Sequence, residues 1–122
     1  MTFGGYLFDE HVPHALIAAL RREEPALPLH VVGRGVAPPL RTADPALLAW
    51  IEEHSCMLVT DNRHSMPVHL RAHLAAGRHV PGILTVRQES MDWRTVVDDL
   101  LLIWEAAGPD DFRDRIDYLP FK

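Results

Sequence analysis

The strongest structural signal in this chain is the stretch from residue 6 to residue 13, Tyr6-Leu7-Phe8-Asp9-Glu10-His11-Val12-Pro13. It begins with three apolar residues and stops abruptly at two acids, as a short buried strand does where it runs out into a loop. Two carboxylates directly after a buried run are costly unless water or a partner satisfies them. The stretch therefore predicts a strand whose end delivers Asp9 and Glu10 to a candidate site.

Along the rest of the chain, short apolar runs alternate with apolar residues at helical spacing. The expected strands span residues 6–8, 29–32, 56–60, 83–86 and, at an edge, 115–119. The expected helices span residues 12–22, 44–54, 65–76 and 92–107, and residues 33–42 are expected to form a loop. This order predicts an α/β fold, a Rossmann-like domain with a mainly parallel sheet of four to five strands and helices on both faces. In such a sheet, ligands bind beyond the carboxyl ends of the strands.

Length and composition favour one ordinary globular domain, residues 1–122. The chain has 122 residues, of which 48% are hydrophobic and 24% charged, so one real core is expected. The formal charge of −5 argues against a broad basic surface that holds double-stranded DNA. A nucleic-acid partner would need a local basic patch or metal ions.

Several other classes of protein lack support in the sequence. The single cysteine, Cys56, has no partner for an internal disulfide, and its apolar neighbours predict a buried thiol. No secretory signal and no apolar run of about 20 residues is present, so a cytoplasmic location without a membrane is expected. We find no glycine-rich phosphate loop, serine nucleophile motif or cysteine pair.

Three acids, Asp9, Asp44 and Asp61, stand at strand ends or at the start of a helix that leads into a strand. Carboxylates of this kind suit Mg²⁺ or Mn²⁺, and a bound ion would offset their mutual repulsion. Glu10 is a fourth possible metal ligand, although neighbours in an extended chain point to opposite sides and we favour Asp9. Asp44 is equally explained as a helix cap before Pro45, and Asp61 as a loop or cap acid.

The order of these motifs resembles the PIN-like family of small bacterial proteins. The resemblance covers roughly residues 6–86 and is carried by Leu7-Phe8-Asp9-Glu10-His11-Val12-Pro13, by Asp44 at a helix start and by Leu58-Val59-Thr60-Asp61. It implies a PIN fold and a metal-dependent ribonuclease site in which Asp9, Asp44 and Asp61 occupy the acidic positions of the family. It also implies, as in some relatives, a toxin that pairs with an antitoxin protein.

The chain departs from the family after the third strand. Relatives commonly show Thr-x-Asp-x-Asp-Phe, whereas residues 60–65 here read Thr-Asp-Asn-Arg-His-Ser and put Asn62 and His64 at the two acidic places. Neutral amide or imidazole groups bind Mg²⁺ less well than carboxylates do. Arg63 is suited to hold a phosphate through a forked pair of hydrogen bonds, with Asn62 and His64 beside it.

Histidines and tryptophans add weaker signals. His69 and His73 lie four residues apart on an expected helix, the spacing of a zinc pair, but no third ligand is evident and a surface or partly buried pair is the simpler interpretation. His11 and His14 lie near the acidic stretch. The apolar stripe from Trp93 to Trp104 is most simply core, with a homodimer face as the alternative.

Two hypotheses follow. In the first, the chain is a metal-dependent enzyme that cleaves RNA phosphodiester bonds with Asp9, Asp44 and Asp61 around Mg²⁺ or Mn²⁺. In the second, it is a catalytically weak PIN-like module that binds a protein or nucleic-acid partner through the same edge. The altered stretch after Thr60 favours the second.

Overall fold

The computed structural model describes residues 2–87 and 92–121. Their strands are β1 (Tyr6–Phe8), β2 (Leu29–Val31), β3 (Met57–Thr60), β4 (Ile83–Val86) and β5 (Ile116–Leu119). Their helices are α1 (His14–Glu23), α2 (Asp44–His54), α3 (Met66–Ala75) and α4 (Trp93–Ala106). The alternation of strand and helix predicted from the sequence is confirmed, including the strand before Pro120.

The strands form one sheet in the order β2-β1-β3-β4-β5, and every neighbouring pair is parallel. The chain first adds β2 on one side of β1 and then crosses to add β3 on the other side. In the register, Phe8 lies opposite both Val31 and Val59. This is a Rossmann-like α/β arrangement with β1 near its centre.

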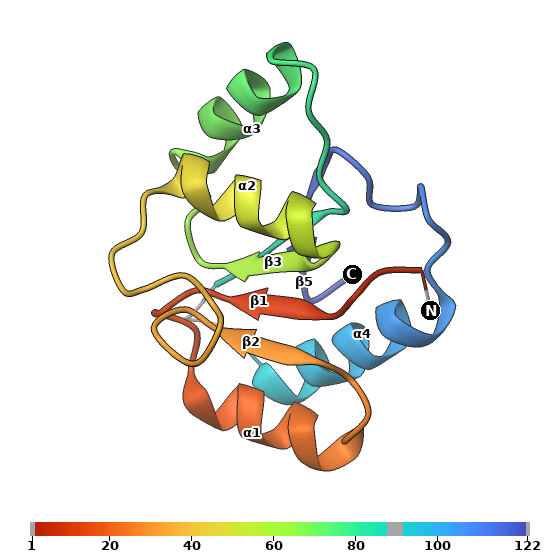
Figure 1. The fold of residues 1–122 in the computed structure, drawn as a ribbon. Helices are drawn as coiled ribbons and strands as arrows, with labels where there is room; N and C mark the ends of the chain where they lie inside the picture. Colours follow the sequence, from red (N-terminus) through yellow and green to blue (C-terminus); the bar gives the residue numbers. More distant parts are fainter. Residues whose placement is uncertain (1, 88–91, 122) are drawn as a thin grey trace.

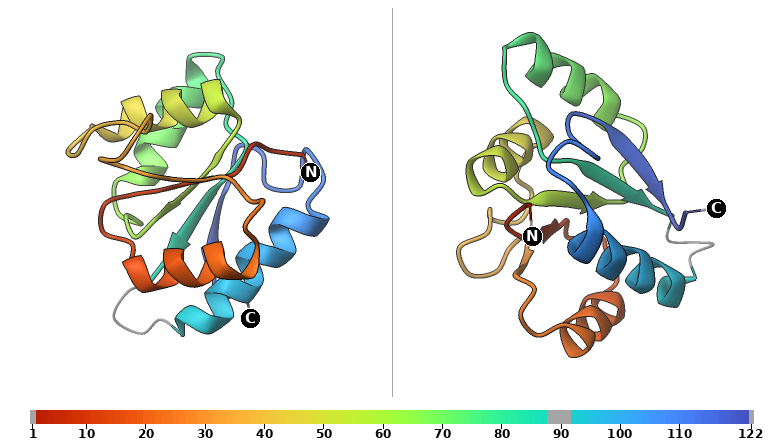
Figure 2. Two further views of the ribbon diagram at one scale, coloured as in Figure 1. Left: turned by 60° about the horizontal axis from the view of Figure 1, so that its bottom comes forward. Right: turned by 90° about the vertical axis from the view of Figure 1, so that its right-hand side faces the viewer.

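Helices cover both faces of the sheet, with α1 and α4 on one face and α2 and α3 on the other (Figures 1 and 2). Side chains alternate along each strand, so each face has its own core. On β1, Tyr6 and Phe8 pack with α1 and α4, whereas Leu7 packs with α2 and α3. The Tyr6 hydroxyl donates a hydrogen bond of 2.6 Å to the Leu100 carbonyl of α4, which ties that helix to β1.

The differences from expectation are small and have local causes. Helix α1 begins at His14 and not at Val12, because Pro13 occupies the N-cap with an extended backbone (ψ 133°). Val12 is nevertheless 2% exposed, since a turn returns its amide to the Asp9 carbonyl. On α4, Val97, Leu100 and Trp104 are buried as expected of a core stripe, but Trp93 at the first turn is 39% exposed and lies outside the core.

Cys56 is confirmed as a buried thiol, 1% exposed just before β3. Burial disfavours the thiolate and raises the pKa of Cys56 to about 11, so this thiol is a packing group and a poor nucleophile. Among residues 2–87 and 92–121, no helix has the length and apolar character that crossing a membrane requires.

Candidate functional site

The candidate site lies where the chain reverses its direction of growth across the sheet, beyond the carboxyl ends of β1 and β3. Helix α1, which follows β1, covers one face, and α2, which leads into β3, covers the other. The loops that leave these two strands therefore part, and open sheets of this kind bind ligands in the resulting crevice. In Figure 1 the arrowheads of β1, β2 and β3 point to the same side, where the loop before α2 also lies.

A row of polar side chains closes the α2 and α3 face at this edge. Asp9, Thr60 and Thr85 each follow an apolar residue of that face by two positions, so the alternation of the strands turns all three to the same side. In the register, Phe8 lies opposite Val59, and Thr60 lies opposite Thr85. Asp9 is 8% exposed and both threonines are 1% exposed, so the row is the polar end of a buried layer.

Asp9 is held by the end of β3 and by its own turn. One carboxylate oxygen, Oδ2, accepts a short hydrogen bond from the Thr60 hydroxyl, and Oδ1 accepts one of 2.9 Å from the His11 amide. Burial, and to a smaller degree the negative charge of Asp61, raise the pKa of Asp9 above its ordinary value, although hydrogen bonds from Thr60, His11 and the Asp61 backbone oppose the rise. Asp9 and Asp61 are thus electrostatically coupled neighbours.

Asn62 connects this pair to the third acid. Its amide nitrogen Nδ2 donates to Asp44 Oδ2 at 2.7 Å, and its backbone amide donates to the Thr60 hydroxyl at 3.1 Å. A chain of contacts therefore runs from Asp9 through Thr60 and Asn62 to Asp44. The sequence left open whether Asp44 returns to this edge, and the structure shows that it does.

The first turn of α2 corrects one expectation about Asp44. Ala43 occupies the N-cap, and Asp44 is already the first residue of the helix, with no side-chain cap bond. Its carboxylate instead faces the site. Asp44 Oδ2 accepts a hydrogen bond from Asn62, and His69 Nε2 of α3 lies 3.6 Å from the same oxygen.

The remaining predicted residues lie around this core of the site. Glu10 is exposed and turned to the loop before α2, where its Oε1 accepts a hydrogen bond of 2.9 Å from the Arg41 amide. Arg63 is half-buried and His64 is exposed in the turn that leads to α3. Within the described residues, neither side chain forms an ion pair with a carboxylate.

Asp9 and Asp61 are the two carboxylates at this edge that could hold one hard cation. Asp9 and Asp61 repel each other, which a divalent ion would relieve, and Mg²⁺ is usually bound through one or two carboxylates plus water and phosphate. Asp44 has its Oδ2 engaged by Asn62. Within residues 2–87 and 92–121, no three His, Cys, Asp or Glu side chains gather closely enough to hold a metal ion.

Sequence reasoning missed four side chains of the site, namely Thr60, Ser65, His69 and Thr85. Two of them had a detectable signal, because Thr60 and Thr85 each lie in an apolar strand two positions after a buried residue. Thr85 is notable because no residue in the described part of the chain supplies a hydrogen-bond partner for its buried hydroxyl. The local pattern did not place Ser65 and His69 here, since tertiary contacts bring both to Asp44, although Ser65 also bonds to Asn62 only three residues away.

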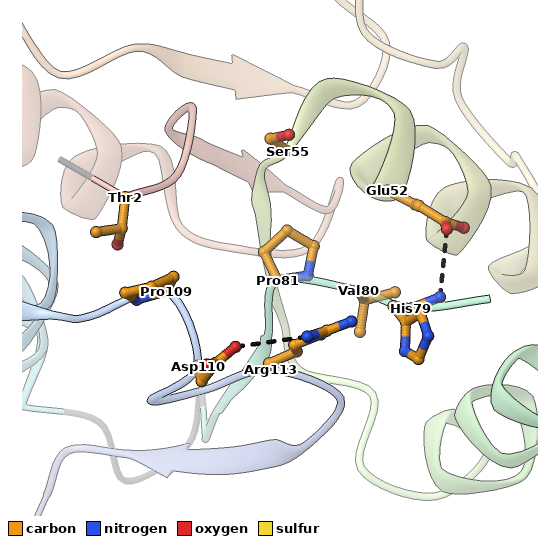
Figure 3. A pocket seen from close by; sticks show the side chains of 9 residues that line it. All are labelled: Thr2, Glu52, Ser55, His79, Val80, Pro81, Pro109, Asp110 and Arg113. Atoms are coloured by element: carbon orange, nitrogen blue, oxygen red, sulfur yellow. Dashed lines mark hydrogen bonds and ion pairs between the residues drawn. The ribbon is translucent and has the colours of Figure 1, made fainter.

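The opposite edge of the sheet carries a second polar cluster beside a cavity of about 290 Å³ (Figure 3). Glu52 of α2 accepts hydrogen bonds of 2.9 Å from both His73 and Arg78, and Asp114 accepts one of 2.7 Å from His79. These hydrogen bonds join α2, α3 and the segments that lead into β4 and β5. The expected pair of His69 and His73 is accordingly divided, with His69 facing Asp44 and His73, 8% exposed, facing Glu52.

Comparison with known proteins identifies no relative: no family model matches the chain, and neither a curated protein nor a solved structure is significantly similar to it.

Proposed function

We propose that this protein is a metal-dependent phosphodiesterase that cleaves RNA at the carboxyl ends of β1 and β3. The observation that carries the proposal is the buried Asp9, whose carboxylate accepts a hydrogen bond from Thr60 at the crevice of the sheet, with Asp61 directly after Thr60 in the chain. Two acids at such a position suit a divalent ion. The resemblance of residues 6–86 to the PIN-like family supports the same activity and adds the proposal of a cytoplasmic toxin with an antitoxin partner.

Asp9 and Asp61 would hold Mg²⁺ or Mn²⁺ through their carboxylate oxygens. When bound, such an ion neutralises charge on the phosphate and lowers the pKa of a bound water. The chain's own residues orient these ligands: Thr60 fixes one oxygen of Asp9, and Asn62 fixes Asp44 beside them. Arg63 follows directly, with its guanidinium unpaired by any carboxylate of the described chain, and would bind a phosphate oxygen of the substrate.

Cleavage of a single-stranded RNA in Mn²⁺, with EDTA in a parallel reaction, tests the activity. We expect cleavage by the wild-type protein in Mn²⁺ only, and a loss of about 100-fold or more for Asp9→Asn and Asp61→Asn, because each removes several kcal/mol of charge stabilisation. Asp98→Asn is the matched control, since Asp98 is an exposed acid of α4 and its variant should cleave as the wild type does.

A second measurement separates loss of the ion from loss of the fold. Mn²⁺ should raise the thermal unfolding midpoint of the wild type and of Asp98→Asn but not that of Asp9→Asn, because an ion that binds only the folded state stabilises it. Cleavage that persists in EDTA, or equal cleavage by Asp9→Asn and Asp98→Asn, would contradict the proposal.

A second candidate, a catalytically weak module that binds RNA or a protein, is favoured by one observation. Asn62 donates to Asp44 where the PIN-like pattern has an acid, so this part of the site is held together by an amide without any ion. The same experiment distinguishes the two: a wild-type protein that retains RNA but does not cleave it in Mn²⁺ supports the module.

A further inference from the structure

Arginines are distributed unequally over the two edges of the sheet. At the amino edge, Arg78 pairs with Glu52 and Arg113 with Asp114. Four arginines instead follow the carboxyl ends of strands, namely Arg34, Arg41, Arg63 and Arg87. In the part of the chain that the structure describes, no carboxylate lies within ion-pair distance of these four. A chain with a formal charge of −5 thus has four arginines near its acidic site that form no ion pair within the described residues.

Arg34 has a specific and unusual partner, the imidazole of His14. The two side chains meet at 2.9 Å, between Arg34 Nη2 and His14 Nδ1. A guanidinium only donates, so Nδ1 accepts in this hydrogen bond and Nε2 is the ring nitrogen that can carry a proton. The contact therefore orients the guanidinium without balancing its charge, and it leaves further N–H groups of Arg34 and the Nε2–H of His14 as donors.

The loop that carries Arg34 is folded against the site. Gly33 donates to the Pro38 carbonyl at 2.7 Å, and a Cβ at Gly33 would lie 2.6 Å from the Leu40 side chain, so the loop closes tightly on glycine with φ of 92°. Glu10, next to Asp9, accepts a hydrogen bond from the Arg41 amide at the far end of the loop. His14 begins α1 five residues after Asp9. The loop that carries Arg34 thus lies at the edge of the sheet where β1 ends (Figure 1).

We infer that Arg34 and His14 bind a phosphodiester group of an RNA strand, next to the group that lies at Asp9 and Asp61. A planar guanidinium with a second donor beside it matches two oxygens of one phosphate. Proteins that bind single strands follow the backbone with cationic groups, and here they also offset the repulsion between the strand and the acidic chain. The inference deepens the proposed function and rests on it for the identity of the strand.

Fluorescence anisotropy of a labelled single-stranded RNA of about 12 nucleotides tests this inference. Binding is measured in Ca²⁺ at several salt concentrations, and a gel confirms that the RNA stays intact. We expect Arg34→Gln to weaken binding about tenfold and to reduce the slope of log Kd against log salt by about 0.7, the effect of one lost phosphate contact. His14→Ala should weaken binding about threefold, because the guanidinium is no longer oriented.

Two variants make the result specific. Arg22→Gln removes the same charge from an exposed arginine of α1 that has no ion pair in the described chain, and it should bind as the wild type does. Arg34→Lys keeps the charge but not the forked geometry, so it should weaken binding while retaining the salt slope. Equal affinities of Arg34→Gln and Arg22→Gln, or no saturable binding by the wild type, would overturn the inference.

The outcome is separable from that of the cleavage experiment. If cleavage depends on metal but binding does not depend on Arg34, the proposed enzyme is supported and the Arg34 subsite is contradicted. If binding depends on Arg34 but the protein does not cleave RNA in Mn²⁺, the subsite is supported and the proposed enzyme is contradicted. Displacement of the RNA by inorganic phosphate at matched ionic strength would overturn a strand site in favour of a small-anion site.

Discussion

Asn62 links several side chains of the candidate site. Its side chain donates to both Asp44 and Ser65 and accepts from the Ser65 backbone amide at 3.1 Å. An acid at this position, as in the PIN-like pattern, would have no hydrogen to donate and would add a second charge beside Asp44. The amide therefore stabilises this edge without an ion, whereas a carboxylate at the same position would need one to offset its repulsion from Asp44.

Asn62→Asp should destabilise the protein in EDTA. We expect a loss of about 1–3 kcal/mol in the free energy of unfolding, because a hydrogen bond to Asp44 is replaced by a like-charge contact. Urea denaturation measures the change, and added salt should reduce it.

His64→Asp is the matched control, since it adds the same charge at an exposed neighbour and should change stability by no more than about 0.5 kcal/mol. If the two variants were equally stable, Asn62 would not hold the edge together.

At the level of elements, Glu52 joins three separate segments. It extends from α2, accepts from His73 of α3, and accepts from Arg78 and the His79 amide in the segment before β4. Its side chain is 32% exposed whereas that of His73 is 5% exposed, so loss of the glutamate leaves a buried imidazole without its acceptor.

Glu52→Ala should therefore lower the free energy of unfolding by about 1–3 kcal/mol, the cost of removing a partner from a buried polar group. Glu53→Ala is the control, because Glu53 is the exposed neighbour on the same helix and has no described contact. The comparison uses urea denaturation at neutral pH. Equal midpoints would show that helix packing alone holds α2 and α3 together.

At the level of the whole molecule, the two edges of the sheet respond differently to acid. Burial would raise the pKa of Glu52, but the His79 amide, Arg78 and His73 outweigh it and the pKa lies below its ordinary value of 4.5. The pKa of Asp114 is also lowered from 3.8, because hydrogen bonds from Val80 and His79 and the charges of His79 and Arg113 outweigh burial. Asp9 at the other edge has a raised pKa, so its contribution to stability is lost as the pH rises and not as it falls.

A carboxylate with a lowered folded-state pKa contributes stability above its unfolded pKa and loses it as the pH falls through the folded value. The contribution of Glu52 should therefore be complete at neutral pH and decline once the pH falls below about 4.5. Urea midpoints in EDTA from about pH 7 to about pH 3 measure it. Glu52→Gln should show a shallower decline than the wild type, and curves of equal slope would contradict the assignment.

Much of the architecture was predictable because its signals are local. The run Tyr6 to Phe8, the helical spacing of Leu47, Leu48 and Ile51, and the glycines and prolines of the loop at 33–42 each indicate a local structure within a few residues. Burial then follows from the alternation of side chains. Where expectation was wrong, at the start of α1 and at the cap of α2, the outcome depended on whether a proline or an acid lies inside or before the first turn, which the pattern leaves ambiguous.

Strand identity, the buried state of Cys56 and the presence of acids after β1 and β3 follow from the amino-acid sequence alone, because periodicity and burial are properties of short segments. The partners of those acids follow only from the fold. The fold brings segments that are 18 to 51 residues apart to one edge of the sheet. Three contacts result from this, namely Asp9 with Thr60, Asn62 with Asp44 and His14 with Arg34. No local pattern specifies such contacts, because strand order and register arise from packing the two helical layers against the sheet.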